Sequence, residues 1–567
     1  MMEHYDRKMG TQVTLILGNH RVNAKKEKLR QNSLYFTALF SENFSDHYLT
    51  EYPINYDISI ITLQDYINWV ENTDPKDDTN ICIKVQPCLE KFVNDDSGLL
   101  DLLNLSIVFM SDKLTKHLTH IITLYWLRPE KLLDIWILAQ NLGLDVLRDV
   151  VYEACLDRFN DLPLEGIMGL SLENLVKLIG NVNVNSAETR LKFIAQESIE
   201  KIRDSSDYDP SNHLFRILMK IADNPVVVCH SMSKNTKPKH VQCVAALKYD
   251  NIRGKIPCVY WFREKVFTEL VDLTSIVDIL DNGKEVFGRQ IIGRGFSIYV
   301  IGGEQGIGSG RFIKTIWRYC LLSSTWFPVA ELPRPRRHMA VAFIKNNLFL
   351  IGGVGSHRVK LSSVDVLNIH TKLWTRIRDI PEMFTEVPAS CVINDKLVYH
   401  KTNFYVYDLK AHRWDTIEMS NHQSSATVRY HVDSLIARND SECCSDDNIY
   451  IGVVESDTMS KTSLSRFHLG RNLNKQIQPI HSWSNKYYRQ IFDGSTLISF
   501  SYKYGRVTVE RGIVKNINTY THIGTHAQSV ENMHDSGFEN RLGCFNIIDP
   551  ALLHKQISFE DEEAIDV

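Results

Sequence analysis

The hydrophobic positions of the chain change their spacing twice, and these changes divide it into three regions. Up to about residue 125, short β-branched runs alternate with segments whose apolar residues recur at helical spacing. From about residue 128 to 225 only the helical spacing is found, and from about residue 241 short apolar runs alternate with glycines and polar loops. We therefore expect a multidomain chain in which an α/β region, an all-α region and an all-β region follow one another.

The first region begins with a predicted β-hairpin. The runs Val13–Leu17 and His20–Ala24 flank the pair Gly18-Asn19, a turn sequence typical of hairpins. A helix is predicted next, because Asn32 or Ser33 can cap it and apolar residues follow at i, i+3, i+4 spacing. Further along, the pattern predicts a strand over 54–59, a helix over 60–72, a strand over 81–85 and a helix over 98–110.

The second region consists of amphipathic helices. Its clearest element begins with Ser171 as the N-cap, has an acidic first turn and ends on Gly180. A basic polar stretch over 230–240 has no apolar period, so we interpret it as a linker to the third region.

The third region contains an internal repeat. Gly302-Gly303 recurs 50 residues later as Gly352-Gly353, and each pair ends an apolar strand. A polar loop, a second strand, a turn and a tryptophan follow each pair, and a third unit keeps this order without the glycines; the tryptophans are Trp326, Trp374 and Trp414. Repeats of about 40 to 50 residues made of short strands are typical of a propeller with one four-stranded blade per repeat.

Both marker residues have a physical role in such a blade. Glycine lets the backbone of an inner strand approach a neighbour closely and leave the strand with positive φ. A tryptophan that no single blade can bury is expected to lie between two blades. The glycines of 302–311 also resemble a phosphate-binding loop, but neither a helix start nor a Gly-Lys-Ser/Thr sequence follows them. We therefore do not expect nucleotide binding.

Composition and charge exclude several function classes. The 567 residues carry a formal net charge of -4, which does not favour a nucleic-acid or anionic-membrane partner. No signal peptide and no apolar run long enough to cross a membrane is found. The 11 cysteines include no Cys-x-x-Cys pair, and Cys443-Cys444 is interpreted as two thiols in a loop. We expect a soluble, cytoplasmic protein with no metal and no other cofactor.

The third region resembles kelch repeats, whose pattern is an apolar strand ending in Gly-Gly, a variable loop, a tyrosine-containing strand and a tryptophan. The segment "VTLILGNHRVNAKKEKLRQNSLYFTALFSENF" resembles the strand, hairpin and helix of a BTB domain, and the following helices resemble a BACK domain. This order of modules is that of the kelch-like proteins. The resemblance implies a BTB domain over 1–125, a BACK domain over 126–229, a linker over 230–240, a kelch propeller of about six blades over 241–545 and an acidic tail over 546–567.

The resemblance also implies a function in ubiquitin ligation. Kelch-like proteins typically act as substrate adaptors of cullin-RING ligases, in which the BTB and BACK domains hold cullin-3 and the propeller holds the protein substrate. Other subunits carry out the chemistry, so the chain is not expected to be an enzyme and no catalytic residue is assigned. The family's cullin contact, an apolar residue followed by any residue and a glutamate, matches Phe44, Ser45 and Asp46, with a shorter carboxylate. The alternative for Phe44 is that it packs inside the BTB fold.

A homodimer through the BTB domain is a further expectation from the resemblance. Two positions depart from the family, since Gln12 stands in place of an aspartate and Lys25 in place of a histidine. The polar residues before Val13 replace a longer helix that helps to form the family's dimer. These departures bear on dimerisation rather than on the fold.

Candidate substrate-binding residues lie in the predicted propeller loops and are partly basic; they are Arg311, Arg337, His338, His357 and Arg358. They lead to the hypothesis of an acidic degron in the substrate, and the alternative is that these side chains are simply solvated. The C-terminal "FEDEEAIDV" is interpreted as a disordered acidic tail. A second interpretation is that the tail folds back on the basic loops and competes with substrate.

Two other functions stay open as alternatives. The same modules serve cytoskeletal, actin-associated or scaffolding kelch proteins that engage no cullin. A copper oxidase with kelch-type blades would need a cage of tyrosines and histidines and a cysteine–tyrosine crosslink. His117 and His120 share a predicted helix, and we interpret them as a solvated or core pair rather than as metal ligands.

Overall fold

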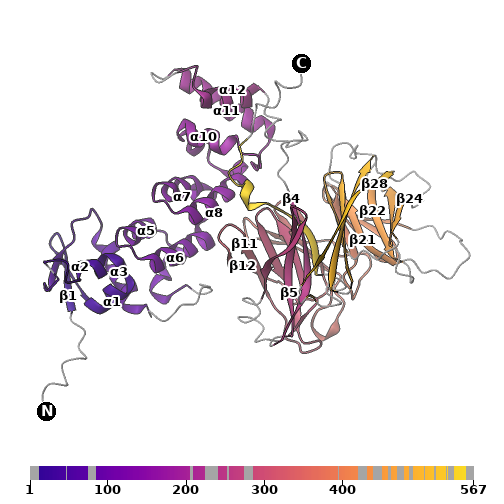
Figure 1. The fold of residues 1–567 in the computed structure, drawn as a ribbon, viewed down its shortest axis with the longest axis horizontal. Coiled ribbons are helices and arrows are strands. Elements are labelled where there is room, and N and C mark those ends of the chain that lie inside the picture. Colours follow the sequence, from indigo (N-terminus) through magenta and orange to yellow (C-terminus); the bar gives the residue numbers. More distant parts are fainter. Residues whose placement is uncertain are drawn as a thin grey trace, which may run out of the picture. The chain divides into compact units, whose positions relative to one another are not determined.

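The computed structural model describes most of the chain (Figure 1). The described residues are 12–45, 47–73, 85–204, 209–223, 240–251, 254–273, 285–393, 395–418, 431–437, 450–456, 462–468, 478–483, 489–503, 505–515, 519–530, 533 and 542–556. Asp46, the Cys443-Cys444 pair, the predicted linker up to residue 239 and the acidic residues after Gln556 lie outside them. The chain divides into two compact units, Met1–Pro238 with Ala551–Val567, and Lys239–Pro550.

The first unit begins with an α/β region. Its strands form one sheet in the order β2-β1-β3, in which β2 is antiparallel and β3 parallel to β1. The predicted hairpin is confirmed, with Gly18 at a φ of 55° in the turn. The elements of this region are β1 (Gln12–Leu17), β2 (His20–Lys25), α1 (Lys26–Asn32), α2 (Leu34–Leu39), β3 (Glu51–Pro53), α3 (Ile60–Asn72), α4 (Lys91–Asn94), α5 (Leu99–Val108) and α6 (Asp112–Ile121).

The strand predicted over 54–59 is wrong, because the third strand lies earlier in the chain. β3 pairs with Thr14–Ile16 through Glu51–Pro53, and the Ile54 N–H extends the contact to Ile16 O at 2.8 Å. Ser59 is then needed as the N-cap of α3, where its hydroxyl accepts from Thr62 N–H at 3.0 Å. The apolar residues over 54–59 therefore belong to the approach to a helix.

Helix α2 forms as its sequence predicts. The Ser33 hydroxyl caps it by accepting from Phe36 N–H at 3.1 Å and donates to Phe109 O at 2.6 Å. Phe36 and Phe40 on its inner side are buried, and the Phe36 ring lies against Phe109 and Tyr66. The cap thus fixes where α2 begins and ties this end of the helix to the residue that follows α5.

The middle of the first unit is helical, as expected. Ser171 caps α10 by accepting from Asn174 N–H at 3.3 Å, and the helix ends at Gly180. Among the described residues no helix is both long and apolar enough to span a membrane. The helices are α7 (Pro129–Asn141), α8 (Asp145–Asp157), α9 (Leu164–Met168), α10 (Leu172–Ile179), α11 (Glu188–Arg203) and α12 (His213–Asp223).

The second unit consists of four-stranded antiparallel sheets consistent with kelch blades. The described residues contain six of them, the number that the repeats predict, and a short ribbon of β7 (Val286–Phe287) with β10 (Glu304–Gln305). The sheets are β8 (Gln290–Arg294), β9 (Ser297–Ile301), β11 (Thr315–Cys320), β12 (Thr325–Glu331); β13 (Ala340–Ile344), β14 (Asn347–Ile351), β15 (Val364–Asn368), β16 (Trp374–Ile377); β17 (Ala389–Ile393), β18 (Lys396–His400), β19 (Phe404–Asp408), β20 (Arg413–Ile417); β21 (His431–Ala437), β22 (Tyr450–Ser456), β23 (Thr462–His468), β24 (Gln478–Trp483); β25 (Arg489–Asp493), β26 (Thr496–Lys503), β27 (Arg506–Lys515), β28 (Thr519–Ser529); and β29 (Gly543–Ile548), β4 (His240–Asp250), β5 (Gly254–Arg263), β6 (Val266–Asp272).

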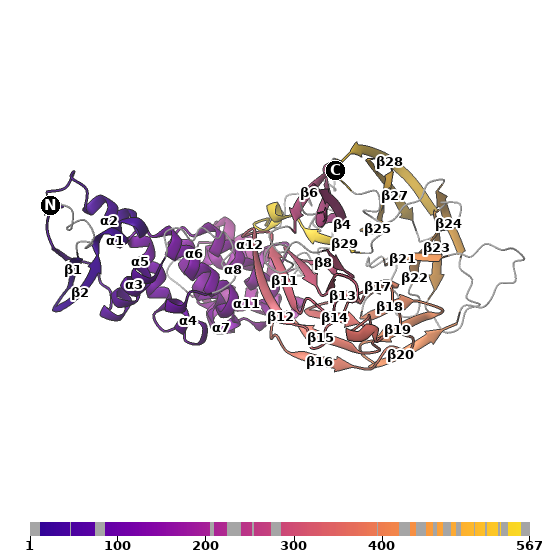
Figure 2. The same cartoon turned by 90° about the horizontal axis from the view of Figure 1, so that it is seen from below.

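The innermost strands of the six sheets close a ring, which Figure 2 shows from below. Strands β8, β13, β17, β21, β25 and β29 each contact the next, and β29 contacts β8. The last strand, β29, pairs with β4, so one sheet combines the two ends of the unit. It runs to Ile548, beyond residue 545 where the blades were predicted to end.

Gly302, Gly353, Trp374 and Trp414, four of the repeat markers, lie close to neighbouring segments of the ring. Gly302 and Gly353 have φ values of +61° and +93°, and a side chain at either position would collide with the backbone of 336–339. Trp374 packs with apolar residues of its own sheet and of the preceding one, including Tyr299. Trp414 likewise packs with apolar residues of its own sheet and of the sheet before it, and its Nε1 donates to Arg378 O at 3.1 Å. These two tryptophans therefore lie between neighbouring blades, whereas the Trp326 ring lies 4.9 Å from that of Tyr319 on its own sheet.

Candidate protein-binding surfaces

A turn after α2 presents Phe44 to solvent. The Phe44 side chain is 51% exposed, although phenylalanine is usually buried. Backbone hydrogen bonds hold the turn, since Phe44 N–H donates to Ser41 O at 3.1 Å and His47 N–H to Phe44 O at 3.2 Å. Lys26 Nζ donates to His47 O at 2.6 Å from the start of α1. Phe44 therefore does not pack inside the fold, and its role in binding a partner stays a prediction.

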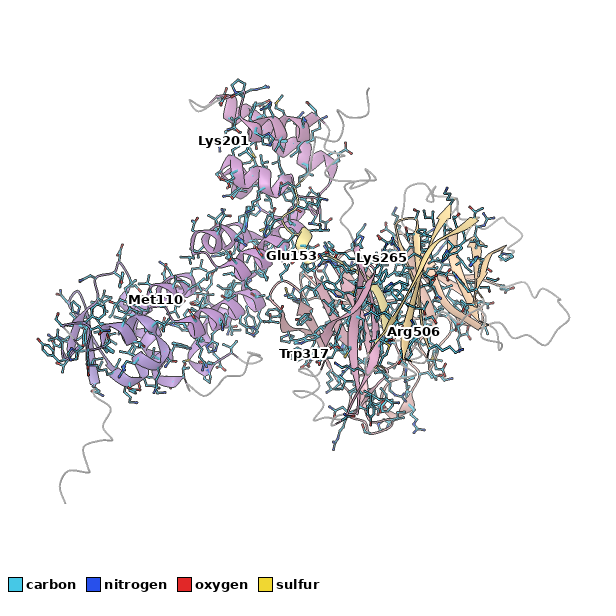
Figure 3. All side chains as sticks on the ribbon, viewed as in Figure 1. Met110, Glu153, Lys201, Lys265, Trp317 and Arg506 are labelled. Carbon is cyan, nitrogen blue, oxygen red and sulfur yellow. The ribbon has the colours of Figure 1, made fainter. Side chains whose placement is uncertain are left out.

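A second apolar surface lies where α2 begins and α5 ends. Leu34 is 62% exposed and Met110, labelled in Figure 3, is 56% exposed. The two residues are adjacent, because Leu34 N–H donates to Met110 O at 3.2 Å. The buried ring of Phe109 lies beneath, with the exposed Tyr56 ring 6.0 Å away. Sequence reasoning missed this surface, since helical spacing alone does not show which apolar residues lie beyond a helix end.

Two of the predicted loop residues are part of the structural framework. The Arg337 guanidinium Nε lies 3.0 Å from a carboxylate oxygen of Glu304, and both side chains are largely buried. Glu304 also accepts from Gly310 N–H at 2.9 Å. The backbone N–H of His338 donates to Gly288 O at 2.8 Å, and burial lowers the pKa of its imidazole. Arg337 therefore joins the loop after β9 to the entry of the next sheet.

The other three predicted residues are exposed in neighbouring loops. Arg311 lies in the loop after β10, and His357 and Arg358 lie in the loop between β14 and β15. A side chain on Gly308 would lie 3.4 Å from the Arg358 guanidinium, so the two loops meet. The structure thus brings Arg311 and Arg358 to one surface of two adjacent sheets.

This surface is basic and partly apolar. Within the part of the chain that is described, Arg311, Arg358 and two nearby lysines, Lys314 and Lys360, form no ion pair. Ile307 and Val359 are exposed large apolar side chains of the same two loops. We call the surface formed by these residues the basic loop surface. Its combination of unpaired positive charge and exposed apolar area suits an acidic segment that also carries apolar side chains.

His117 and His120 both lie on α6, but their surroundings differ. The Trp69 indole donates to His117 Nδ1 at 3.2 Å. Burial lowers the pKa of His120 to about 4. Among the described residues, no three His, Cys, Asp or Glu side chains are grouped so that they could hold a metal ion.

The partly buried His120 makes the first unit sensitive to acid. Its imidazole stays neutral in the folded state down to a pKa of about 4, whereas the unfolded chain takes up the proton at the ordinary pKa of 6.5. Folding stability is therefore lost as the pH falls from about 6.5 towards 4, by about 2 kcal/mol between pH 7 and 5. In His120→Gln we expect this part of the pH dependence of urea unfolding, followed by far-UV circular dichroism, to disappear. His20→Gln is the control, because His20 is an exposed residue of β2. An equal loss of unfolding free energy on acidification in His120→Gln and wild type would contradict the prediction.

The ring of four-stranded antiparallel sheets is consistent with a set of kelch blades. The Kelch motif family matches residues 297–333 and 335–381. The chain carries kelch motifs and is a distant homologue of the poxvirus Kelch repeat and BTB domain-containing proteins.

Among these relatives are the Kelch repeat and BTB domain-containing protein 1 of horsepox virus and that of vaccinia virus strain Copenhagen. Each is 22% identical to this chain over 392 residues, which is 68% of this chain and 58% of the relative. The protein 1 of ectromelia virus strain Moscow is 21% identical over the same length. A solved structure of YjhT aligns at 12% identity with a TM-score of 0.30, covering 43% of this chain and 85% of that one, which is too low a score to support the fold.

Proposed function

We propose that this chain is a substrate-recognition adaptor of a cullin-3 RING ubiquitin ligase. Its first region would be a BTB domain and its helices a BACK domain, which together hold the cullin, and its ring of blades would be a kelch propeller that holds the substrate. The observation that carries the proposal is the exposed Phe44 in the turn after α2, at the apolar position of the family's cullin contact. The protein would act in the cytoplasm, and a homodimer through the BTB domain is part of the proposal.

The geometry around Phe44 supports a binding role. A solvent-exposed aromatic ring on a turn held by Ser41, His47 and Lys26 is positioned before any partner arrives, so little entropy is lost on binding. The surface of Leu34, Tyr56 and Met110 offers further apolar area on the same region. Aromatic and aliphatic residues that are exposed in the free protein are typical anchors of protein interfaces.

The basic loop surface is the proposed substrate site. Arg311 and Arg358 would bind carboxylates of an acidic degron, while Ile307 and Val359 would contact its apolar residues. His357 is exposed beside Arg358 and extends the same loop. Arg337 and His338 would support these loops rather than contact the substrate directly, because both are tied into the framework.

The test is the binding of the full chain to the N-terminal domain of cullin-3, for wild type and Phe44→Ala. Burying a phenylalanine ring contributes about 1.5–3 kcal/mol, so we expect Phe44→Ala to weaken binding about 10- to 150-fold. Isothermal titration calorimetry measures the affinity directly. Ile523→Ala is the matched control, because Ile523 on β28 is 49% exposed and lies in the second unit.

The same experiment separates the adaptor from its alternative. If wild type does not bind cullin-3, the proposal fails, and the chain is better described as a scaffolding or actin-associated kelch protein. Equal affinities for wild type and Phe44→Ala would show that a cullin contact, if present, does not use this turn.

A further inference from the structure

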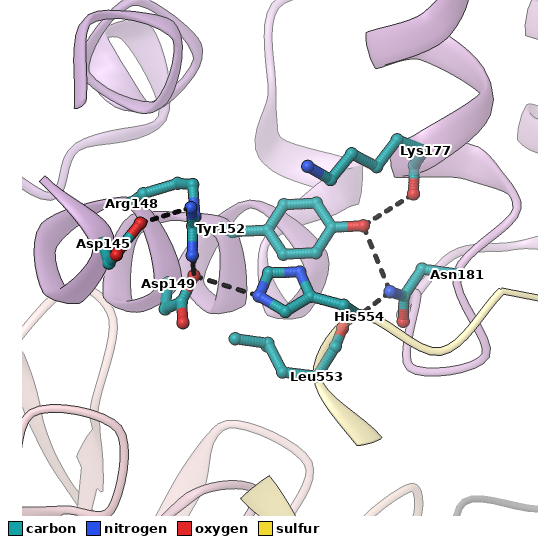
Figure 4. A network of polar contacts seen from close by, with 8 residues as sticks. All are labelled: Asp145, Arg148, Asp149, Tyr152, Lys177, Asn181, Leu553 and His554. Carbon is teal, nitrogen blue, oxygen red and sulfur yellow. Dashed lines mark hydrogen bonds and ion pairs between the residues drawn. The ribbon is translucent and has the colours of Figure 1, made fainter. Parts of the chain in front are cut away.

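The last described residues of the chain, Ala551–Gln556, lie against helices of the first unit (Figure 4). We call this segment the clasp. It follows β29 after a connection of Asp549 and Pro550. Leu553, in its middle, is 1% exposed, whereas its neighbour Leu552 is only half-buried.

Backbone groups of the clasp are bound at several points. The side-chain amide of Asn181 donates to Leu553 O at 2.7 Å and that of Asn183 to Leu552 O at 2.8 Å. The N–H of Val182 donates to Lys555 O at 3.2 Å, and Asn181 forms an antiparallel bridge with Gln556. The loop after α10 therefore binds the clasp much as one strand binds another.

Asn181 and Tyr152 form the base of this site. Asn181 is fully buried, and its amide nitrogen also lies 3.1 Å from the Tyr152 hydroxyl, which donates to Lys177 O at 2.6 Å. Burial raises the pKa of Tyr152, so the hydroxyl stays protonated and keeps this donor role. The Tyr152 ring stacks on Trp136 at 5.0 Å, which fixes it within the helical core.

Side chains of the clasp add specific contacts. The His554 ring stacks on Tyr152 with centroids 5.5 Å apart and planes at 11°, and its Nε2 lies 3.0 Å from Asp149 Oδ1. Gln556 Nε2 donates to Lys177 O at 3.0 Å. Asp149 and Tyr152 lie on α8 and Lys177 lies on α10, so the clasp bridges two helices (Figure 4).

We propose that the clasp is an intramolecular ligand of the site between α8 and α10, and that it holds the ring's closing strand β29 in place. β29 is the innermost strand of its sheet; it pairs with β4, and its last residue, Ile548, donates its N–H to Gly295 O of the neighbouring sheet at 2.9 Å. Its C-terminal end is separated from the bound clasp only by Asp549 and Pro550, so while Leu553 stays buried this end of β29 is tethered to a folded unit and cannot fray as a free chain end. Fixing a strand end in this way lowers the entropy gained when the ring opens.

The test is hydrogen exchange, followed by mass spectrometry, of the full chain with Leu553→Ala beside Leu552→Ala. The two variants remove the same side chain from adjacent positions, but only Leu553 is fully buried. We expect Leu553→Ala to speed exchange about tenfold over 181–184 and in β29 and β4, and to leave β13–β19 unchanged. Leu552→Ala should exchange as wild type does.

A second pair of variants keeps the test valid if Leu553→Ala folds poorly. His554→Ala removes the ring stacked on Tyr152, and Lys555→Ala removes an exposed neighbour whose side chain the site does not use. Faster exchange in His554→Ala but not in Lys555→Ala, over 181–184 and β29, supports the proposal. If neither Leu553→Ala nor His554→Ala exchanges faster than its control over 181–184, the docking of the clasp is overturned. If exchange is faster there but unchanged in β29, the proposed hold on the closing strand is overturned.

Discussion

Asp365→Asn is expected to lower the free energy of unfolding of the second unit by about 3–5 kcal/mol. Asp365, on β15, pairs with the guanidinium of Arg336, which is 0% exposed. The same guanidinium lies 3.3 Å from the carbonyl oxygens of Leu350 and Gly352. An amide in place of the carboxylate would leave the buried positive charge without its counterion, and burial already lowers the pKa of Arg336.

The measurement is urea unfolding followed by tryptophan fluorescence, since Trp326, Trp374 and Trp414 all lie in the blades. Asp379→Asn is the matched control, because Asp379 pairs with Arg376 at 2.8 Å near the same sheet but both side chains are about half exposed. Exposed pairs contribute little to stability. A loss for Asp365→Asn no greater than that of Asp379→Asn would show that the buried pair does not support the blade.

The Arg336–Asp365 pair is also a contact that the sequence alone cannot predict. Arg336 and Asp365 are 29 residues apart, and nothing in their spacing indicates that they meet. The sequence drew attention instead to Arg337 and His338, because they fall in a predicted strand-connecting loop of the propeller. The backbone of 336–339 actually runs against the Gly-Gly turns, and this places Arg336 inside the sheet and Arg337 beside Glu304.

The repeat and the helix ends could be predicted because they depend on local rules. Ser33 and Ser171 cap the helices that follow them, as the chemistry of their hydroxyls indicates. The strand at 51–53 was missed because its position depends on pairing with β1, which is a tertiary contact. Sequence periodicity cannot show such a register.

The candidate sites also divide into those that a local sequence pattern indicates and those that depend on tertiary contacts. Phe44 was found through resemblance to a family, and the structure adds that its ring is exposed. The clasp was missed because Ala551–Gln556 is a short stretch without an apolar period, next to a conspicuous acidic run. Its partners Tyr152 and Asn181 lie about 370 to 400 residues earlier, as the separation of 372 between Asn181 and Leu553 illustrates. Arg311 and Arg358 were correctly placed in loops, but only the structure shows that the two loops meet.

The second large effect is expected for Gly353→Ala, and it explains why the Gly-Gly pair recurs. Gly353 has a φ of +93°, and an added Cβ would lie 2.7 Å from the carbonyl oxygen of Arg337 and 3.0 Å from the backbone nitrogen of Met339. These atoms belong to the chain entering β13 and cannot move as a flexible side chain would. The left-handed conformation costs about 1–2 kcal/mol and the overpacking about 1–3 kcal/mol more. We therefore expect Gly353→Ala to destabilise the second unit by about 2–5 kcal/mol.

Gly310→Ala separates the two contributions. Gly310 has a similar φ of +75°, but nothing lies within 4 Å of the Cβ that the substitution adds. Its cost should therefore be the conformational part alone, about 1–2 kcal/mol. Urea unfolding of the two variants then measures the close approach of the backbones as a difference. If the two substitutions cost the same, the recurring glycines are required for their φ only, and the close packing of neighbouring blades would not explain why two glycines recur after each strand.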